Sequence, residues 1–278
     1  MGLKSVLKPI LRPIRLAGGR FFIPPADDSD TIIWKAAQIL SGELVEGDYL
    51  EFGVFRGGSF ASAFNTIKNV YTQRSRHDVH TQDYRKRVVR MWDEMRFFAF
   101  DSFCGLPKPR SIDAASKDFV ESKYSCDLSS FRANLKSASV NLSKVIAIPG
   151  WFEETCVPKT IEQHNIKAAA LIHIDCDLYE SAQIALKFIE PLLADGSVII
   201  FDDWYCFRGN PELGEQRAFS EWKDTLRGWT FSEFQKEGPW RVSFIASRVT
   251  GAVVPCNANG SLRQERAASH AEPLRSLE

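Results

Sequence analysis

Residues 171–177 (LIHIDCD) and 197–203 (SVIIFDD) decide the fold class of this 278-residue chain. Each stretch is a short apolar run that stops at aspartates, as a strand buried on both faces of a parallel sheet does at its carboxyl end. Residues 179–193 between them have a helical pattern, so the two strand ends are expected side by side. Open α/β sheets bind ligands at such ends, where carboxylates from two strands suit a divalent cation.

The same alternation of strand and helix patterns extends along most of the chain. We expect parallel strands at residues 49–52, 96–101, 144–149, 169–175 and 197–201, with helices at 30–40, 59–70, 129–137, 161–165, 179–193 and 215–226. Asp195 and Gly196 are expected to close the helix at 179–193. Residues 229–234 and 241–246 are expected to pair as an antiparallel edge. This order predicts an α/β fold: a doubly wound, mostly parallel Rossmann-like sheet of about seven strands, with helices on both faces.

The composition excludes several classes of protein. The net charge is zero and the pI is near 7.0, so no global field attracts nucleic acid. No stretch approaches the roughly 18 to 20 uninterrupted apolar residues of a membrane span. The six cysteines show no CxxC and no zinc-ligand spacing, which is typical of reduced thiols in the cytoplasm.

We expect one main domain at residues 30–250, between a basic, apolar N-terminal arm (1–29) and a loose C-terminal tail (251–278). The arm is expected to pack on the domain or on a second subunit, giving a homo-oligomer; contact with a membrane surface is the alternative. Residues 72–96 look like a helical insertion with an apolar stripe. We interpret it as a solvated amphipathic helix that covers one side of the domain, with substrate contact as the alternative.

The first strand runs into a glycine-rich turn, EFGVFRGGS, at residues 51–59. Three glycines between a strand and a helix allow the backbone to approach a ligand closely at the helix N-terminus. The spacing is not the GxGxxG of dinucleotide folds, and a nucleoside ligand without a pyrophosphate, such as S-adenosylmethionine, needs no full phosphate cradle. A plain strand–helix turn is the alternative.

Two further strands end in residues that suit a nucleoside. Asp101 ends the second strand, where an acid can bind both ribose hydroxyls. Gly150, Trp151 and Phe152 follow the third strand, where the aromatic pair is either a wall near the adenine or part of the core.

Asp175, Asp202 and Asp203 are the sharpest set of candidate ligands. Three buried carboxylates repel one another, so a positive charge is expected between them. The alternative is that they cap helices or pair with Lys or Arg. Asp177 is expected to be the N-cap of the helix that follows it. His173 lies within its strand and is either a satisfied core histidine or a base.

Five segments, EFGVFRGG, FDSFCGLP, GWFEET, HIDCDLYES and IIFDDW, occur in this order and together resemble the macrocin O-methyltransferase family over residues 45–225. The resemblance implies a metal-dependent enzyme that uses S-adenosylmethionine to methylate sugar hydroxyls of natural products. It also implies roles for particular residues. The methionine part of the cofactor would be surrounded by Glu51, Gly53, Arg56, Gly57, Gly58 and Ser59; Asp101 and Ser102 would hold the ribose, and Gly150, Trp151 and Phe152 would line the adenine.

By the same resemblance, Asp175, Asp202 and Asp203 match the family's magnesium-binding acids, with Mn²⁺ as an alternative ion. The chain departs from the family at Cys156, where leucine is usual, and in the length of the 72–96 insertion. Both departures leave the cofactor chemistry intact but put the identity of the small-molecule or glycan acceptor in doubt.

The resulting hypothesis is that Mg²⁺ on the three aspartates chelates two neighbouring hydroxyls of the acceptor. Asp175 or His173 would take the proton, and Trp204, Tyr205 and Phe207 would form a stacking wall for a sugar or belong to the core. Two other functions remain open. Asp175-Cys176-Asp177 is a DxD of the kind that glycosyltransferases use, and a non-catalytic protein could retain the same fold.

Overall fold

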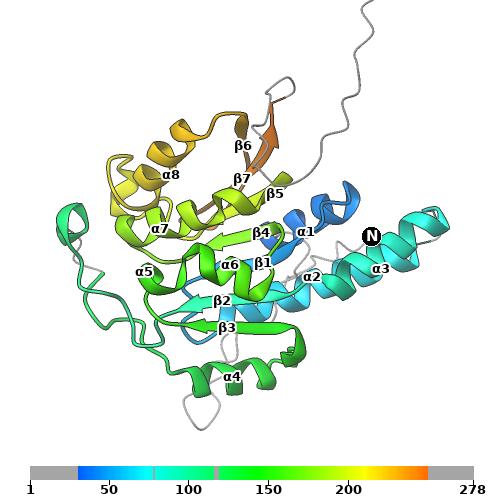
Figure 1. The fold of residues 1–278 in the computed structure, drawn as a ribbon, viewed down its shortest axis with the longest axis horizontal. Helices are drawn as coiled ribbons and strands as arrows, with labels where there is room; N and C mark the ends of the chain where they lie inside the picture. The colour runs from blue at the N-terminus through cyan, green and yellow to red at the C-terminus, as the bar shows by residue number, and fades with distance from the viewer. Residues whose placement is uncertain (1–30, 78, 116–118, 250–278) are drawn as a thin grey trace, which may run out of the picture.

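The computed structural model describes residues 31–77, 79–115 and 119–249, which form a seven-stranded sheet with helices on both faces (Figure 1). The strands are β1 (Asp48–Phe52), β2 (Phe97–Asp101), β3 (Val145–Pro149), β4 (Ala169–Ile174), β5 (Leu193–Phe201), β6 (Trp229–Glu237) and β7 (Arg241–Arg248). Their order in the sheet is β3-β2-β1-β4-β5-β7-β6. The first five are parallel, whereas β7 is antiparallel to both β5 and β6. The predicted doubly wound sheet with an antiparallel edge is confirmed.

The helices divide into two layers because successive strand residues point to opposite faces of the sheet. They are α1 (Ile32–Gly42), α2 (Gly58–Arg76), α3 (Gln82–Glu94), α4 (Leu128–Ser137), α5 (Phe152–Thr155), α6 (Pro158–His164), α7 (Tyr179–Ile189) and α8 (Gly214–Thr225). Tyr49 packs into the hydrophobic cluster that includes α1 to α4. Its neighbour Leu50 packs into the cluster with α7 and α8. The sheet is therefore buried between two apolar layers.

The ends of two helices show where local signals hold and where they fail. Thr31 caps α1, since its hydroxyl accepts a hydrogen bond from the amide of Trp34 at 3.2 Å. The predicted helix end at Asp195 and Gly196 is wrong, because α7 stops at Ile189 and β5 already begins at Leu193. Pro191 supplies no amide donor and cannot continue the helix. Asp195 and Gly196 instead lie in an irregular part of β5, where the register with β4 shifts.

Residues 72–96 form the end of α2 and the whole of α3, which packs back against α2 (Figure 1). On α3, Val88 and Met91 are buried, while most of its other residues are half-buried or exposed. The hydroxyl of Tyr84 donates to the carbonyl of Ser41 at 2.8 Å and ties the helix to α1. This segment is thus an amphipathic helix laid over one layer of the domain.

The N-terminal arm (1–29) and the C-terminal tail (251–278) predicted from the sequence lie outside the described residues. Within the described part of the chain, none of the helices combines the length and the apolar character needed to span a bilayer. Starting from β1, the strands are added first on one side of the sheet, as β2 and β3, and then on the other side, as β4 and β5. The order therefore reverses between β1 and β4, which are neighbours in the sheet. Ligands of open α/β sheets bind at the carboxyl ends of strands at such a switch point.

Candidate functional site

A cavity of about 280 Å³ opens at the carboxyl ends of the parallel strands. One side is lined by predicted nucleoside-binding positions, namely Gly53, Asp101, Ser102, Gly150, Trp151 and Phe152. The other side is lined by four aspartates, Asp175, Asp177, Asp202 and Asp203. The predicted sets from distant parts of the chain therefore meet in one cavity.

Gly53 is the point of closest backbone approach in this cavity. Its φ of +88° is in the left-handed region, and a Cβ on it would lie 1.9 Å from the carbonyl oxygen of Asp175. Hydrogen bonds fix both residues of this contact. The amide of Gly53 donates to the carbonyl of Phe100, and the amide of Asp175 donates to the carbonyl of Phe52. Only glycine fits at this point, where the chain leaves β1 close against the residue that follows β4.

The remaining motif residues stand behind the cavity. Arg56, Gly57, Gly58 and Ser59 are not among its lining residues. Gly57 has a φ of +82° and precedes α2, and a Cβ there would meet the ring of Phe131 at 2.9 Å. A Cβ on Gly58 would meet nothing within 4 Å. The two glycines thus shape the turn between β1 and α2.

Glu51 is fully buried beneath the cavity rather than exposed in it. Its carboxylate accepts hydrogen bonds from the hydroxyl of Ser59, at 2.5 Å, and from the hydroxyl of Tyr49. The bond from Ser59 joins the end of β1 to the first turn of α2. In this position Glu51 and Ser59 brace the glycine-rich turn.

Asp101 braces the same turn from β2. Its carboxylate accepts from the amides of Val54 and Phe55 at 2.8 and 3.0 Å and from the amide of Phe103 at 2.7 Å. Burial raises the pKa of Asp101, and the three amides oppose this increase. Ser102 donates to the carbonyl of Gly105 at 2.8 Å and lines the cavity beside it.

The aromatic pair after β3 serves the cavity and the core at once. Trp151 lines the cavity and is 38% exposed. Phe152 also lines the cavity, but its ring packs edge-on against Phe52 with centroids 5.8 Å apart. Phe152 therefore both lines the cavity and packs in the core, the two roles that the sequence left open. Trp151 is free to contact a ligand.

The acidic side of the cavity carries more negative charge than its protein partners neutralise. Burial and the carboxylate of Asp202 raise the pKa of Asp175 well above its usual value, and burial and Asp203 do the same for Asp177. Burial also raises the pKa of Asp203. Beneath them Glu215 is buried and accepts from the amide of Asp203 at 3.0 Å.

Two carboxylate oxygens of this group are buried without any hydrogen-bond partner in the described part of the chain. They are Oδ2 of Asp203 and Oε1 of Glu215. Buried polar atoms are rarely left unpaired, and hard oxygen ligands are what Mg²⁺ and Mn²⁺ prefer. The unpaired oxygens of Asp203 and Glu215 therefore suit a divalent cation, and Asp175 and Asp177 line the same cavity as Asp203.

Asp202 differs from its neighbours because it has cationic partners. Its Oδ1 accepts from Nε of Arg241, on β7, and lies 3.1 Å from Nε2 of His173. Although burial by itself raises the pKa of Asp202, His173 and Arg241 reverse the effect and lower it to about 2. Pairing with an arginine, an alternative left open by the sequence, therefore applies to this one acid of the predicted metal set.

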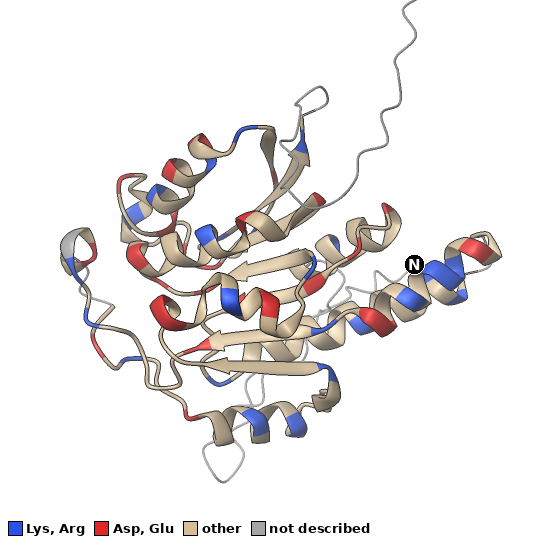
Figure 2. Cartoon of the chain, viewed as in Figure 1, with Lys and Arg blue, Asp and Glu red and all other residues tan. Residues whose placement is uncertain are grey.

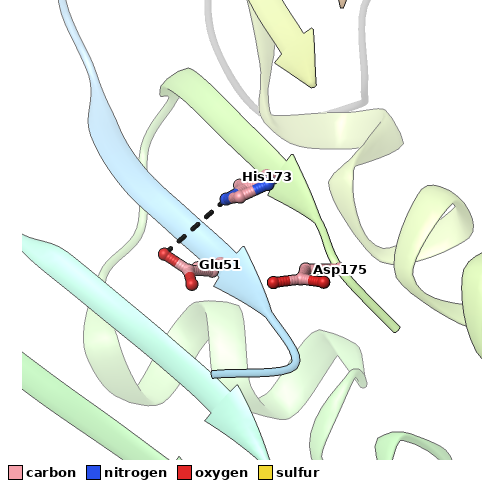
Figure 3. Close-up of side chains that lie close together, drawn as sticks. All are labelled: Glu51, His173 and Asp175. Carbon is pink, nitrogen blue, oxygen red and sulfur yellow. Dashed lines mark ion pairs between the residues drawn. The ribbon is translucent and has the colours of Figure 1, made fainter. Parts of the chain in front are cut away.

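His173 is buried between two carboxylates. Figure 3 shows its ring on β4 facing Glu51 on β1, with Asp175 just beyond the end of β4. Its Nδ1 lies 3.8 Å from Oε2 of Glu51. Burial lowers the pKa of His173, but its hydrogen bond to Asp202 and the nearby carboxylate of Glu51 outweigh burial and raise it to about 10. Its place between two carboxylates suits an ion pair better than a base.

Glu51, His173 and Asp175 are themselves close enough to resemble a metal site, with one ligand atom of each within 4.8 Å of the others. The first two are almost fully buried and neutralise each other. The unpaired oxygens of Asp203 and Glu215 make the neighbouring acidic group the better place for a cation.

The prediction that Asp177 caps the following helix is wrong. Asp177 has a φ of +64° and lines the cavity, while the N-cap residue of α7 is Leu178, which makes no side-chain hydrogen bond to the helix. The cap comes from Asp113, whose carboxylate accepts from the amides of Tyr179 and Glu180 at 3.0 and 3.3 Å. No local pattern could reveal this partner, since it lies 66 residues earlier in the chain.

The predicted stacking wall of Trp204, Tyr205 and Phe207 is absent from the residues that line the cavity. Trp204 packs in the core between Phe201, Phe219 and Phe244. The aromatic and apolar surface near the opening comes from Phe55, Leu106, Pro107 and Tyr124. Leu106 and Pro107 belong to the segment FDSFCGLP, which the sequence had singled out, whereas nothing in the sequence pointed to Tyr124.

Comparisons with known proteins find relatives among O-methyltransferases. Residues 87–224 match the family model described as Macrocin-O-methyltransferase (TylF). The chain is 30% identical over 167 residues to a rhamnosyl-tetracenomycin C 4'-O-methyltransferase of Streptomyces olivaceus, covering 58% of this chain and 54% of the relative. It is 27% identical to the demethyldecarbamoylnovobiocin O-methyltransferase of Streptomyces niveus, covering 70% of this chain and 67% of that protein. The chain therefore spans about half to two thirds of the length of these relatives.

Solved structures of low sequence identity share the fold. The O-methyltransferase NovP matches with a TM-score of 0.54 and 20% identity, covering 78% of each chain. The calicheamicin methyltransferase CalS11 matches with a TM-score of 0.54 and 19% identity, covering 77% of this chain and 76% of the other.

Proposed function

Because the chain belongs to the macrocin O-methyltransferase family, we propose that it is an S-adenosylmethionine-dependent O-methyltransferase assisted by Mg²⁺. The observation that carries the proposal is the cavity at the β1/β4 switch point. It joins a glycine turn and an aromatic pair to a cluster of carboxylates, so that a nucleoside and a cation would lie within one site.

At the cofactor end, the chain contributes shape rather than charge. Gly53 lets the chain that leaves β1 lie close against Asp175, and Asp101 holds the turn with three amide contacts. Trp151 offers an exposed ring for the adenine, and Ser102 lies beside Asp101 for the ribose. The sulfonium of S-adenosylmethionine supplies an electrophilic methyl group, so the protein has only to present an aligned nucleophile.

At the acidic end, Asp175 and Asp203 would hold the cation, joined by Asp202 once its arginine partner leaves. A bound divalent cation lowers the pKa of a hydroxyl and orients it. We assign the role of proton acceptor to Asp175, which lines the cavity, rather than to His173, which is held between Glu51 and Asp202.

The acceptor we propose is a hydroxyl on a sugar carried by a natural product. One relative is named for the 4'-oxygen of a compound that carries a rhamnosyl group, and another, of Micromonospora griseorubida, is named for the 3''-oxygen of mycinamicin III. Phe55 and Tyr124, which contact each other edge-on at 5.7 Å near the opening, would provide an apolar surface for the ring. The DxD glycosyltransferase alternative explains neither the glycine turn nor the family match.

The test begins with a calorimetric titration of S-adenosylmethionine into cofactor-free protein, where we expect micromolar binding, about −8 kcal/mol. Methyl transfer to glycosylated acceptors is then followed by mass spectrometry with Mg²⁺ or with a chelator. Asp203→Asn should lower the transfer rate by roughly 100-fold, because it removes a cation ligand, while the affinity for S-adenosylmethionine stays within about threefold.

Asp224→Asn is the matched control, since this acid is 71% exposed and lies on α8 away from the cavity. It should transfer methyl groups at the wild-type rate. Full activity of Asp203→Asn in the presence of chelator would exclude the metal-assisted reaction. An absence of S-adenosylmethionine binding in the wild type would exclude the methyltransferase itself.

A further inference from the structure

Positive charge is distributed unevenly over the acidic group at the cavity. Asp202 has two cationic partners, His173 and Arg241, which hold its pKa low. Asp175, Asp177 and Asp203 have no ion pair with Lys, Arg or His among the described residues. One of the carboxylates proposed for the cation is therefore already neutralised by the protein.

We propose that Arg241 is an internal counter-ion that occupies Asp202 while the site is free of metal and is displaced when a divalent cation binds. This inference rests on the proposed metal-assisted function and adds a residue that controls the loading of the metal. Arg241 begins β7, next to the end of β5 where Asp202 follows, so its guanidinium reaches Asp202 from outside the parallel part of the sheet.

The two partners of Asp202 differ in freedom to move. His173 is nearly fully buried and is fixed on its other side by Glu51, at 3.8 Å, and by the hydroxyl of Tyr49, at 3.5 Å. The side chain of Arg241 is 36% exposed. Arginine is long and rotates without backbone movement, so Arg241 can leave Asp202 while His173 stays.

A second position for the arginine is already present. Nη1 of Arg241 lies 3.8 Å from Oε2 of Glu237, which is its register partner at the end of β6. The same oxygen of Glu237 accepts from the amide of Ile32 at 3.1 Å, which fixes the carboxylate at the start of α1. Arg241 can therefore pass from Asp202 to Glu237 and remain paired with a carboxylate.

This exchange makes protein and metal compete for one carboxylate. A cation that binds must displace a guanidinium from Asp202, which lowers the apparent affinity for the metal. Removing the charge of Arg241 should strengthen metal binding, and removing its second position at Glu237 should weaken it. If Arg241 only oriented Asp202, removing its charge would instead weaken metal binding, because the carboxylate would lose its orientation.

The experiment measures Mn²⁺ binding to the full-length, metal-free protein by the electron paramagnetic resonance of free Mn²⁺, without S-adenosylmethionine, and repeats it with Mg²⁺ as competitor. Arg241→Gln should bind Mn²⁺ at least about tenfold more tightly than the wild type, a change of about 1.4 kcal/mol. Arg241→Lys, which keeps the charge, should stay within about threefold of the wild type. Glu237→Gln, which keeps an oxygen for Ile32, should bind Mn²⁺ several-fold more weakly.

Arg248→Gln is the control for loss of a positive charge on the same strand. Arg248 ends β7, about 20 Å along the strand from Arg241, and its guanidinium lies over the ring of Trp229. It should bind Mn²⁺ as the wild type does. Equal or weaker binding by Arg241→Gln, where the wild type does bind, would overturn the inference and leave the proposed function standing.

If neither the wild type nor Arg241→Gln binds Mn²⁺ or Mg²⁺, the inference and the metal-assisted part of the function both fail. Calorimetry with S-adenosylmethionine on the same samples then decides whether methyl transfer without metal survives. Should Arg241→Gln not fold, the pair of Arg241→Lys and Glu237→Gln still decides the question, because unchanged affinity in Glu237→Gln contradicts the exchange.

Discussion

Gly53 and Gly58 belong to one motif but meet opposite steric conditions. A Cβ on Gly53 would lie 1.9 Å from a backbone oxygen of Asp175, just beyond β4, and its φ of +88° strains any other residue. A Cβ on Gly58 would meet nothing within 4 Å, and this residue starts α2. Gly53→Ala should therefore lower the free energy of unfolding by roughly 3 kcal/mol and impair binding of S-adenosylmethionine.

Gly58→Ala is the matched variant and should raise the free energy of unfolding by roughly 0.5 kcal/mol, since alanine restricts the unfolded chain and suits a helix. Urea denaturation of both variants measures the two effects. Equal stability losses in the two variants would contradict the steric argument. A large loss of cofactor affinity in Gly58→Ala alone would show that its missing side chain matters to the ligand and not to the fold.

At the same scale, the sequence revealed the acids but not their partners. Asp175, Asp202 and Asp203 could be located because each follows a run of apolar residues, which is a local pattern. Arg241, which pairs with Asp202, lies 39 residues further along the chain and reaches it only because β7 pairs with β5. A pairing of this kind depends on the three-dimensional register, so no spacing in the sequence announces it.

Among the elements, α7 depends on a residue outside itself. Asp113 caps its N-terminus through two amides and in doing so holds the segment between β2 and α4, which also supplies Leu106 and Pro107 to the cavity. Asp113→Ala should lower the free energy of unfolding by about 1 to 2 kcal/mol, the usual effect of losing an N-cap. Because the segment is released as well, the affinity for S-adenosylmethionine should fall several-fold.

Asp113→Asn retains one oxygen acceptor for the α7 amides and should lose less than half as much stability, as measured by urea denaturation. Asparagine also cannot ionise in a place where burial raises the pKa of the acid. Identical stability of Asp113→Ala and the wild type would mean that water satisfies the first turn of α7 and that Asp113 does not hold the loop.

Elements were predicted well where the chain is apolar and poorly where a tertiary contact ends them. All seven strands were expected near their observed positions, because buried strands carry continuous apolar runs. The end of α7 was misplaced, since a proline and pairing of Leu193 with Ala169 outweigh the glycine that follows. Trp204 was expected either in a ligand wall or in the core, and the aromatic side chains of α8 and β7 that pack around it confirm the core.

In the whole molecule, charge is balanced overall and concentrated locally. The net charge is zero, and Figure 2 shows acidic and basic residues interspersed over the helices of both faces. The cavity is the exception, with four aspartates along one side and Glu215 beneath. The metal-free protein therefore carries a local destabilisation that composition does not reveal.

This destabilisation should depend on pH in a direction set by Asp203. Burial raises its pKa above the usual 3.8, so the folded state holds its proton more tightly than the unfolded state does. The stability that this proton contributes is present at low pH and is lost as the pH rises through the folded-state pKa.

With a chelator present, Asp203→Asn should match the wild type near pH 4 and exceed its unfolding free energy by roughly 1 kcal/mol at neutral pH. With Mg²⁺ the order at neutral pH should reverse, because only the wild type keeps the ligand. Thermal unfolding over this pH range measures both effects. A difference that is independent of pH and of Mg²⁺ would show that Asp203 neither ionises under strain nor binds the cation.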